Sequence, residues 1–256
     1  MTLRFISRDD AFSGYPWLAR QVLDWQSDAL DPAADRYEPG DEVFMELDDE
    51  EATVLTAAFA EQLNREHDAQ LAALRDDFHG PLPDGQSIAF TIAEPPGATP
   101  EQSAEMAGPA FNELCQALGC DEIAIMPMTR TPILVQQNEH SAAAHQTLEG
   151  LGLKPDFDGA VAGAPDAIAP FVAALFRIAR CDASAPYIVF GMKGLAIAGA
   201  FCKYVNFHFE SYEKGTSEDL MNALPACGFT VPEDAMCRER FSETGAMDGR
   251  RLDLGI

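Results

Sequence analysis

Residues 201–212, with the sequence FCKYVNFHFESY, constrain the fold more than any other part of the chain, because apolar and polar side chains alternate along them. Successive side chains of a β-strand point to opposite faces, so this period of two predicts one long extended strand. Phe201, Val205, Phe207 and Phe209 then share one face, which must be buried. The chain therefore has to form a sheet with a hydrophobic layer packed on these side chains.

The opposite face of the expected strand is polar and carries the candidates for catalysis, Tyr204, Asn206, His208 and Glu210. A histidine and a glutamate two positions apart on one face lie close together, so Glu210 could orient His208 as a general base. The simpler alternative is that this face is polar because it is exposed to water. Cys202 shares the face, but six residues of extended chain place it roughly 20 Å from His208, too far for a pair of thiolate and imidazole.

The rest of residues 85–256 alternates between helical and extended patterns. Residues 99–102, Thr-Pro-Glu-Gln, form a capping box with proline at the first helical position, and this is a specific signal for a helix start. The expected strands cover residues 87–93, 123–128, 132–137, 156–162, 187–190 and 195–209, and the expected helices cover residues 100–118, 141–150, 166–180 and 217–226.

This order of elements predicts an α+β fold. It contains two β-α-β-β-α units that form an antiparallel or mixed sheet with helices on one face. Residues 114–121 resemble residues 175–182, and residues 148–153 resemble residues 224–229, which supports an internal duplication. Coincidence between two ordinary helix–strand junctions is the alternative.

The duplication also predicts that a second strand ends in polar residues near the candidate site. The second strand of the first unit ends in Gln136, Asn138 and His140. If the two units are related by a pseudo-twofold axis, these side chains converge with the polar face around His208. They are therefore candidates for binding a ligand.

Residues 1–80 are expected to form a helical and strongly acidic region that precedes this domain. They hold 19 acidic and 6 basic residues, so they contribute −13 to the formal charge of −25. One helix is expected over residues 10–26, where Pro16 is tolerated only in the first turn. A second is expected to begin at the acidic residues 48–51, which suit the positive end of a helix dipole, and to reach His79.

The excess of acid excludes a nucleic-acid groove or an anionic membrane surface as the partner, since both require clustered cations. It favours a non-catalytic interaction module that docks a basic protein, for example in the neutralisation of a toxin. The alternative is a small-molecule enzyme or ligand binder that uses the face of Tyr204, Asn206, His208 and Glu210, and the sequence does not decide between the two.

The candidate partner-binding residues are aromatic anchors and acids of the N-terminal region, namely Trp17, Trp25, Asp41, Glu42, Asp48 and Asp49. The acidity could equally serve solubility in a saline cytoplasm.

The six cysteines are interpreted as reduced and buried, since they are sparse, lie in apolar runs and include no C-x-x-C pair. No metal site or cofactor is expected, because His140 and His145 are five residues apart rather than the four of a zinc-binding helix motif. The chain starts without an apolar run typical of a signal peptide and contains none long enough to span a bilayer, so a cytoplasmic location is expected. Four lysines against thirteen arginines fit a GC-rich bacterial genome.

Overall fold

The computed structural model describes residues 3–34, 36–44, 52–135 and 137–241. The chain divides into two compact units, and each is described by itself. Residues 1–22 and 78–256 form the larger unit, and residues 23–77 form the smaller one. Among the described residues, no helix is both long and apolar enough to cross a lipid bilayer.

The larger unit is built on a seven-stranded sheet in which every neighbouring pair of strands is antiparallel. The order of the strands across the sheet is β1-β6-β5-β7-β8-β9-β4. Their bounds are β1 Arg4–Ile6, β4 Ala89–Ala93, β5 Ile123–Pro127, β6 Ala160–Gly163, β7 Ile188–Met192, β8 Ile197–Phe201 and β9 Phe207–Ser211. Together with the helices, this sheet confirms the expected α+β class.

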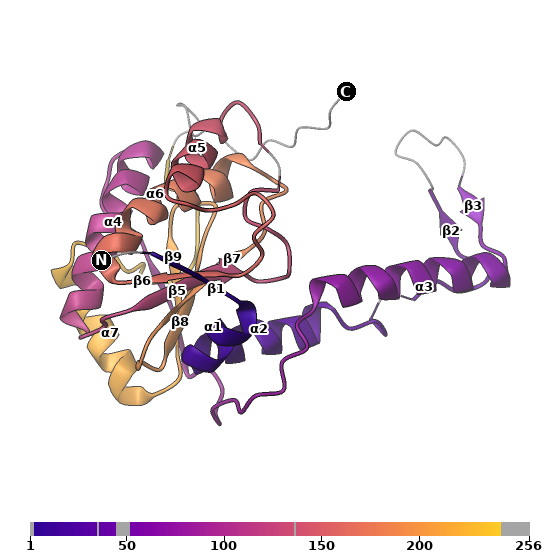
Figure 1. Ribbon diagram of the computed structural model, residues 1–256, viewed down its shortest axis with the longest axis horizontal. Coiled ribbons are helices and arrows are strands. Elements are labelled where there is room, and N and C mark those ends of the chain that lie inside the picture. Colours follow the sequence, from indigo (N-terminus) through magenta and orange to yellow (C-terminus); the bar gives the residue numbers. More distant parts are fainter. Residues whose placement is uncertain (1–2, 35, 45–51, 136, 242–256) are drawn as a thin grey trace. The chain divides into compact units, whose positions relative to one another are not determined.

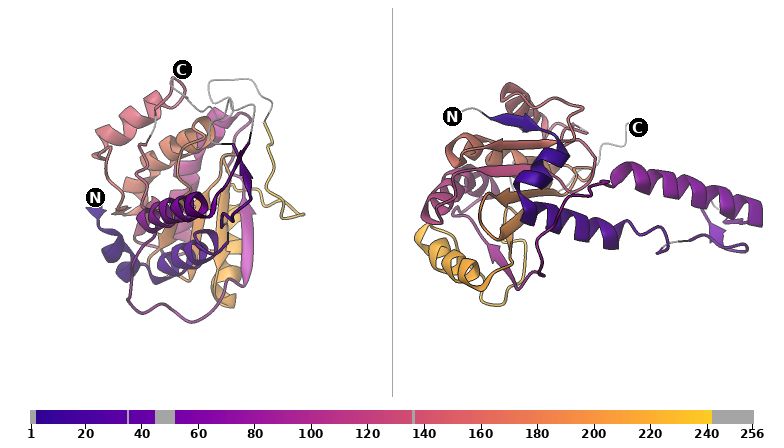
Figure 2. Two further views of the ribbon diagram at one scale, coloured as in Figure 1. Left: turned by 90° about the vertical axis from the view of Figure 1, so that its right-hand side faces the viewer. Right: turned by 60° about the horizontal axis from the view of Figure 1, so that its bottom comes forward.

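Four helices cover one face of the sheet (Figures 1 and 2). They are α4 Pro100–Ala117, α5 Ala142–Gly150, α6 Pro165–Cys181 and α7 Lys214–Ala226. Between this layer and the sheet lies a core of aromatic rings, in which Phe207 contacts Phe111, Phe176 and Phe201 with centroids 5.0, 4.9 and 5.5 Å apart. The phenylalanines of residues 201–209 are therefore buried, as their alternation predicts.

The other face of the sheet is covered too, which the expectation of helices on one face missed. There the first turns of α2 Pro16–Ala29, which follows α1 Arg8–Gly14, pack on it. A Cβ atom on Gly191 would lie 2.6 Å from the Cβ of Leu18, so the glycine permits this close approach. The Trp17 ring stacks on Tyr212 with centroids 4.6 Å apart.

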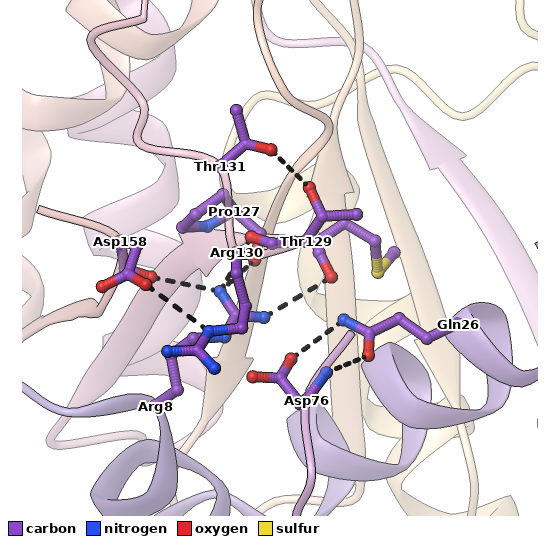
Figure 3. Close-up of polar contacts among 9 residues, drawn as sticks. Arg8, Gln26, Asp76, Pro127, Thr129, Arg130, Thr131 and Asp158 are labelled. Carbon is purple, nitrogen blue, oxygen red and sulfur yellow. Dashed lines mark hydrogen bonds and ion pairs between the residues drawn. The ribbon is translucent and has the colours of Figure 1, made fainter. Parts of the chain in front are cut away.

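Arg8 fixes the start of α1 to the end of β5 (Figure 3). Its guanidinium is buried, and Nη1 donates to the backbone carbonyls of Pro127, Thr129 and Asp158 at 2.9, 3.0 and 3.2 Å. Carbonyl oxygens left over where a strand ends need donors, and a buried arginine supplies several at once. Arg130 adds an ion pair with the Asp158 carboxylate at 3.6 Å.

The single long strand expected over residues 201–212 is wrong. The chain folds back in a hairpin, because β8 ends at Phe201 and β9 begins at Phe207. The five residues between them form a loop closed by hydrogen bonds from the Cys202 N–H to the Asn206 carbonyl and from the Val205 N–H to the Cys202 carbonyl, both 2.9 Å. Val205 has a φ of 59°, a conformation that β-branched residues rarely adopt.

The strand expected over residues 132–137 is also wrong for the residues that are described, 132–135 and 137. Ile133 and Leu134 are both buried, although they are neighbours and would point to opposite faces of a strand. This segment is a loop that leads into α5. The first expected unit thus lacks one of its strands, and the sheet does not show the duplication.

Helix boundaries follow local signals more closely. Thr99 caps α4, and its Oγ1 accepts a hydrogen bond from the Gln102 N–H at 3.2 Å, which confirms the expected start. The helix expected over residues 10–26 is divided before Pro16, where α2 begins.

The smaller unit contains the end of α2, a two-stranded antiparallel sheet of β2 Glu42–Val43 and β3 Thr53–Val54, and α3 Ala57–Leu74. The start expected for α3 at residues 48–51 lies outside the described residues, and α3 is instead capped by Thr56 and ends before His79. Gln26 holds Asp76 through two hydrogen bonds of 2.9 Å, drawn in Figure 3.

Candidate metal centre

Cys202, His208 and Cys237 bring three potential metal ligands together in the larger unit. Their donor atoms all lie within 4.8 Å of one another. The two Sγ atoms are 3.4 Å apart, and His208 Nε2 is 3.1 Å from Cys237 Sγ. Within the described part of the chain, this is the one group of three or more cysteine, histidine or acidic side chains arranged to share a cation.

The hairpin explains why Cys202 and His208 meet. Phe201 pairs with Phe207 and Ala200 pairs with His208, so Cys202 at the start of the loop lies above His208 rather than far along one strand. The separation of roughly 20 Å that a continuous strand would impose is therefore wrong. Residues 202–206 contain no glycine or proline, so the sequence carries no strong turn signal there.

Cys237 comes from an irregular segment near the C-terminus that three neighbouring residues hold in place. Glu239 forms an ion pair of 2.6 Å with Arg180, whose side chain is only 4% exposed. Arg240 donates to the Pro95 carbonyl at 3.0 Å and to Ser103 Oγ at 2.7 Å. Phe241 is buried in the main core. These contacts fix the segment directly after Cys237.

The surroundings favour a thiolate at Cys237. The hydrogen bond with Cys202 and those from His208 and Asn206 lower the pKa of Cys237 to about 4, although burial opposes the shift. The same contact with Cys237, together with burial, raises the pKa of Cys202. Asn206 Nδ2 donates to Cys237 Sγ, and the Tyr204 N–H donates to Cys202 Sγ, both at 3.5 Å. The thiolate is the form of cysteine that binds metals and acts as a nucleophile.

The imidazole of His208 is held from two sides. Its Nδ1 lies 3.4 Å from the hydroxyl of Tyr187, and the ring packs edge-on against Phe90 at 5.3 Å between centroids. These contacts leave Nε2 directed at Cys237. A partner on the far nitrogen is how metal-binding histidines are usually oriented.

A cavity of about 420 Å³ adjoins the group, and Cys202 lies in its wall. Small apolar residues form much of the lining, while Tyr187 and Lys203 contribute polar groups. Cys237 is half-buried, and Cys202 is 8% exposed. The site is therefore open on one side.

The remaining catalytic candidates are Glu210, Asn206 and Tyr204, and each makes defined contacts in the structure. Glu210 accepts hydrogen bonds from Gln21 Nε2 and the Tyr212 hydroxyl, both at 2.9 Å, and these partners occupy its two carboxylate oxygens. Asn206 belongs to the site through its amide. Tyr204 contributes its backbone N–H, while its ring lies beneath the Lys203 ammonium.

The expected ligand-binding residues lie in a loop with its own internal hydrogen bonds. Asn138 Oδ1 accepts from the N–H groups of His140 and Ser141, and Nδ2 donates to the Cys181 carbonyl. His140 Nε2 lies 3.2 Å from the Glu139 carboxylate. Gln136 lies outside the described residues.

The expected partner-binding residues are divided between the two units. Trp17 packs on Tyr212 in the larger unit and is only partly exposed. In the smaller unit Trp25 is exposed, Glu42 lies in β2, and the Asp41 carboxylate accepts from the Glu38 N–H at 2.7 Å. Asp48 and Asp49 lie outside the described residues.

No protein-family model, curated protein or solved structure matches this chain. The geometry around Cys237 and the distribution of charge are therefore the features that indicate a function.

Proposed function

We propose that this chain is a zinc-dependent enzyme in which Cys202, His208 and Cys237 hold the ion and a fourth position stays open for water or substrate. The observation that carries the proposal is the convergence of two sulfur atoms and one imidazole nitrogen within 4.8 Å. Cysteine and histidine are the ligands that zinc prefers. Three protein ligands with one open position are typical of catalytic rather than structural zinc sites.

The distances between the donor atoms suit this ion. With Zn–S bonds of about 2.3 Å and a Zn–N bond of about 2.0 Å, ligand atoms of a tetrahedral site lie about 3.5–3.8 Å apart. The observed separations of 3.4 and 3.1 Å need to widen by only a few tenths of an ångström. The N–H groups of Tyr204 and Asn206 already point at the two sulfur atoms and would stabilise their negative charge.

Bound zinc would supply a nucleophile, because it lowers the pKa of a coordinated water to about 7. The cavity that Cys202 lines would give a small substrate room next to this ligand, with apolar walls and the polar groups of Tyr187 and Lys203. These features favour hydrolysis of a small molecule. A reducing compartment such as the cytoplasm, which is part of the proposal, would keep both cysteines available as ligands.

Metal titration tests the proposal. Cobalt should bind the metal-free protein at one ion per chain with the visible absorption of a tetrahedral site and a thiolate-to-cobalt charge-transfer band, and zinc should displace it. Cys237→Ser and His208→Gln should each abolish this spectrum. Cys227→Ser is the matched control, since Cys227 lies at the end of α7 and outside the group. The absence of cobalt binding by the wild type, or equal spectra in all variants, would refute a metal site here.

The charge of the smaller unit favours a second function, the docking of a basic protein. Residues 23–77 hold 17 acidic and 3 basic residues, a net charge of −14 in fewer than a quarter of the residues. Among the described residues of this unit, four large apolar side chains are exposed, namely Trp25, Tyr37, Phe44 and Val54. Opposite charge accelerates association and selects partners, and exposed aromatic side chains commonly anchor them.

A comparison of two charge-reduced variants tests the docking function. The double variant Asp41→Asn, Glu42→Gln removes two charges from the smaller unit, and Asp166→Asn, Asp219→Asn removes two from the larger one. A basic protein retained from lysate at low salt, and released at roughly 0.15 M salt or above, should be lost with the first variant only. Equal retention by both variants would mean that the acidity serves solubility alone.

A further inference from the structure

We infer that Cys202 and Cys237 also form a redox couple, in which a hydroperoxide converts the two thiols into a disulfide. The geometry that points to this is the 3.4 Å separation of the two Sγ atoms. If the metal site proposed above is correct, the same reaction removes two of its three ligands and releases the ion. The disulfide step rests on the geometry alone, whereas the release of metal rests on the proposed function.

The two cysteines differ in access, which assigns them different roles. Cys237 is half-buried and lies in an irregular segment, so a small hydroperoxide can reach its sulfur. Cys202 is 8% exposed and lines the cavity, and its Sγ lies 3.4 Å from Cys237 Sγ, within reach of a sulfenic acid formed there. Cys237 is therefore the residue that is oxidised first, and Cys202 is the resolving residue.

The local backbone allows the bond to form. A disulfide has an S–S distance of about 2.05 Å, so the sulfur atoms must approach by a little more than 1 Å. Cys202 begins the β8–β9 loop and Cys237 lies outside helices and strands, so neither belongs to a regular element that would have to break. The Cys237 Sγ atom is held in place by His208 Nε2 at 3.1 Å and by Asn206 Nδ2 at 3.5 Å.

The reaction takes place in two steps. The Cys237 thiolate attacks the outer oxygen of the hydroperoxide, an S–O bond forms, the O–O bond breaks, and the departing alkoxide takes a proton from water. Cys202 then attacks the Cys237 sulfenic acid, an S–S bond forms, the S–O bond breaks, and water leaves with the Cys202 proton. In sum, one thiolate, one thiol, one hydroperoxide and one proton from solvent give one disulfide, one alcohol and one water, with sulfur oxidised and peroxide oxygen reduced.

Peroxide treatment of the metal-free and the zinc-loaded protein tests the inference. One equivalent of hydrogen peroxide should remove two hydrogen atoms from the intact mass, and peptide mapping should find residues 202 and 237 cross-linked. Dithiothreitol should reverse the change. With Cys202→Ser in the metal-free protein, the oxidised Cys237 should persist as a sulfenic acid that dimedone traps. Cys227→Ser should behave like the wild type.

The outcomes separate this inference from the proposed function. A cross-link between other cysteines, or unchanged products with Cys202→Ser, would overturn the redox couple even if zinc binds. If the protein binds no zinc but still forms the cross-link between residues 202 and 237, the result supports the redox couple and contradicts the zinc enzyme. Release of zinc together with the cross-link supports both.

Discussion

Cys202 and Cys237 are separated by 35 positions in the sequence, yet their Sγ atoms lie 3.4 Å apart. Two independent features bring them together. The β8–β9 hairpin turns Cys202 back over His208, and the anchors Glu239 and Arg240 fix the segment that carries Cys237. Each feature can be weakened by its own substitution, so the contribution of each one to the site can be measured separately.

Asn206→Ala should weaken zinc binding by about tenfold, because loss of a partner around a metal ligand typically costs 10- to 100-fold in affinity. The Asn206 amide donates to Cys237 Sγ at 3.5 Å, so its removal leaves the thiolate without that hydrogen bond. Competition with a chromophoric chelator measures the change. Asn112→Ala, on the surface of α4, is the control and should bind zinc as the wild type does. Equal affinities would show that the amide does not support the site.

Glu239→Gln should lower the free energy of unfolding by about 1–3 kcal/mol, because it removes a carboxylate that pairs with the buried guanidinium of Arg180. It should also speed alkylation of Cys237, since the segment that carries this residue loses an anchor. Denaturant unfolding and mass spectrometry after a short exposure to iodoacetamide measure the two effects.

Asp234→Asn is the matched control, because it removes an exposed ion pair with Arg238 in the same segment. Such surface pairs contribute roughly 0–1 kcal/mol. If both variants change stability and alkylation equally, the Arg180 contact is not what positions Cys237.

Local patterns in the sequence predict much of this fold. The capping box at Thr99 predicts the start of α4, and the alternation of Phe207, His208 and Phe209 predicts which face of β9 is buried. Both signals depend on residues that are close together in the chain, where spacing alone determines which side chains share a face.

The site could not be predicted in the same way, because it depends on contacts between distant residues. The turn at residues 202–206 requires a positive φ at Val205. Valine rarely adopts this backbone conformation, so its presence in the sequence does not indicate a turn. Cys237 is held at the site by the contacts of Glu239, Arg240 and Phe241 with residues far away in the sequence. One signal was present, a histidine between two cysteines in the last quarter of the chain, but its spacing fits no local metal motif.

Phe207→Ala should lower the free energy of unfolding by about 3–5 kcal/mol, as expected for a large side chain removed from a packed core. Its ring contacts those of Phe111, Phe176 and Phe201, so the cavity left behind cannot close easily. Phe44→Ala is the control, because Phe44 is exposed, and it should change stability little. If Phe207→Ala lowers the free energy of unfolding by less than about 1 kcal/mol, this ring does not contribute to core packing as expected.

Glu122→Gln should destabilise the protein at neutral pH and much less in acid. The Glu122 carboxylate accepts from Tyr15, Arg4 and Lys193 at 2.7, 2.6 and 2.8 Å. Burial favours its neutral form, but these hydrogen bonds and positive charges outweigh burial and lower the pKa of Glu122 below its ordinary value.

A carboxyl group with a lowered pKa in the folded state contributes its full stability above the pKa of the unfolded chain, about 4.3, and loses it as the pH falls further. Since the side chain is 23% exposed, we expect a difference of about 1 kcal/mol between wild type and Glu122→Gln at pH 7. Urea unfolding at a series of pH values should show this difference narrowing below about pH 4. The control Glu61→Gln removes an exposed ion pair with Arg65 and should show a smaller difference at pH 7. A difference for Glu122→Gln that stays constant from neutral to acidic pH would mean that its charge is not what stabilises the contact.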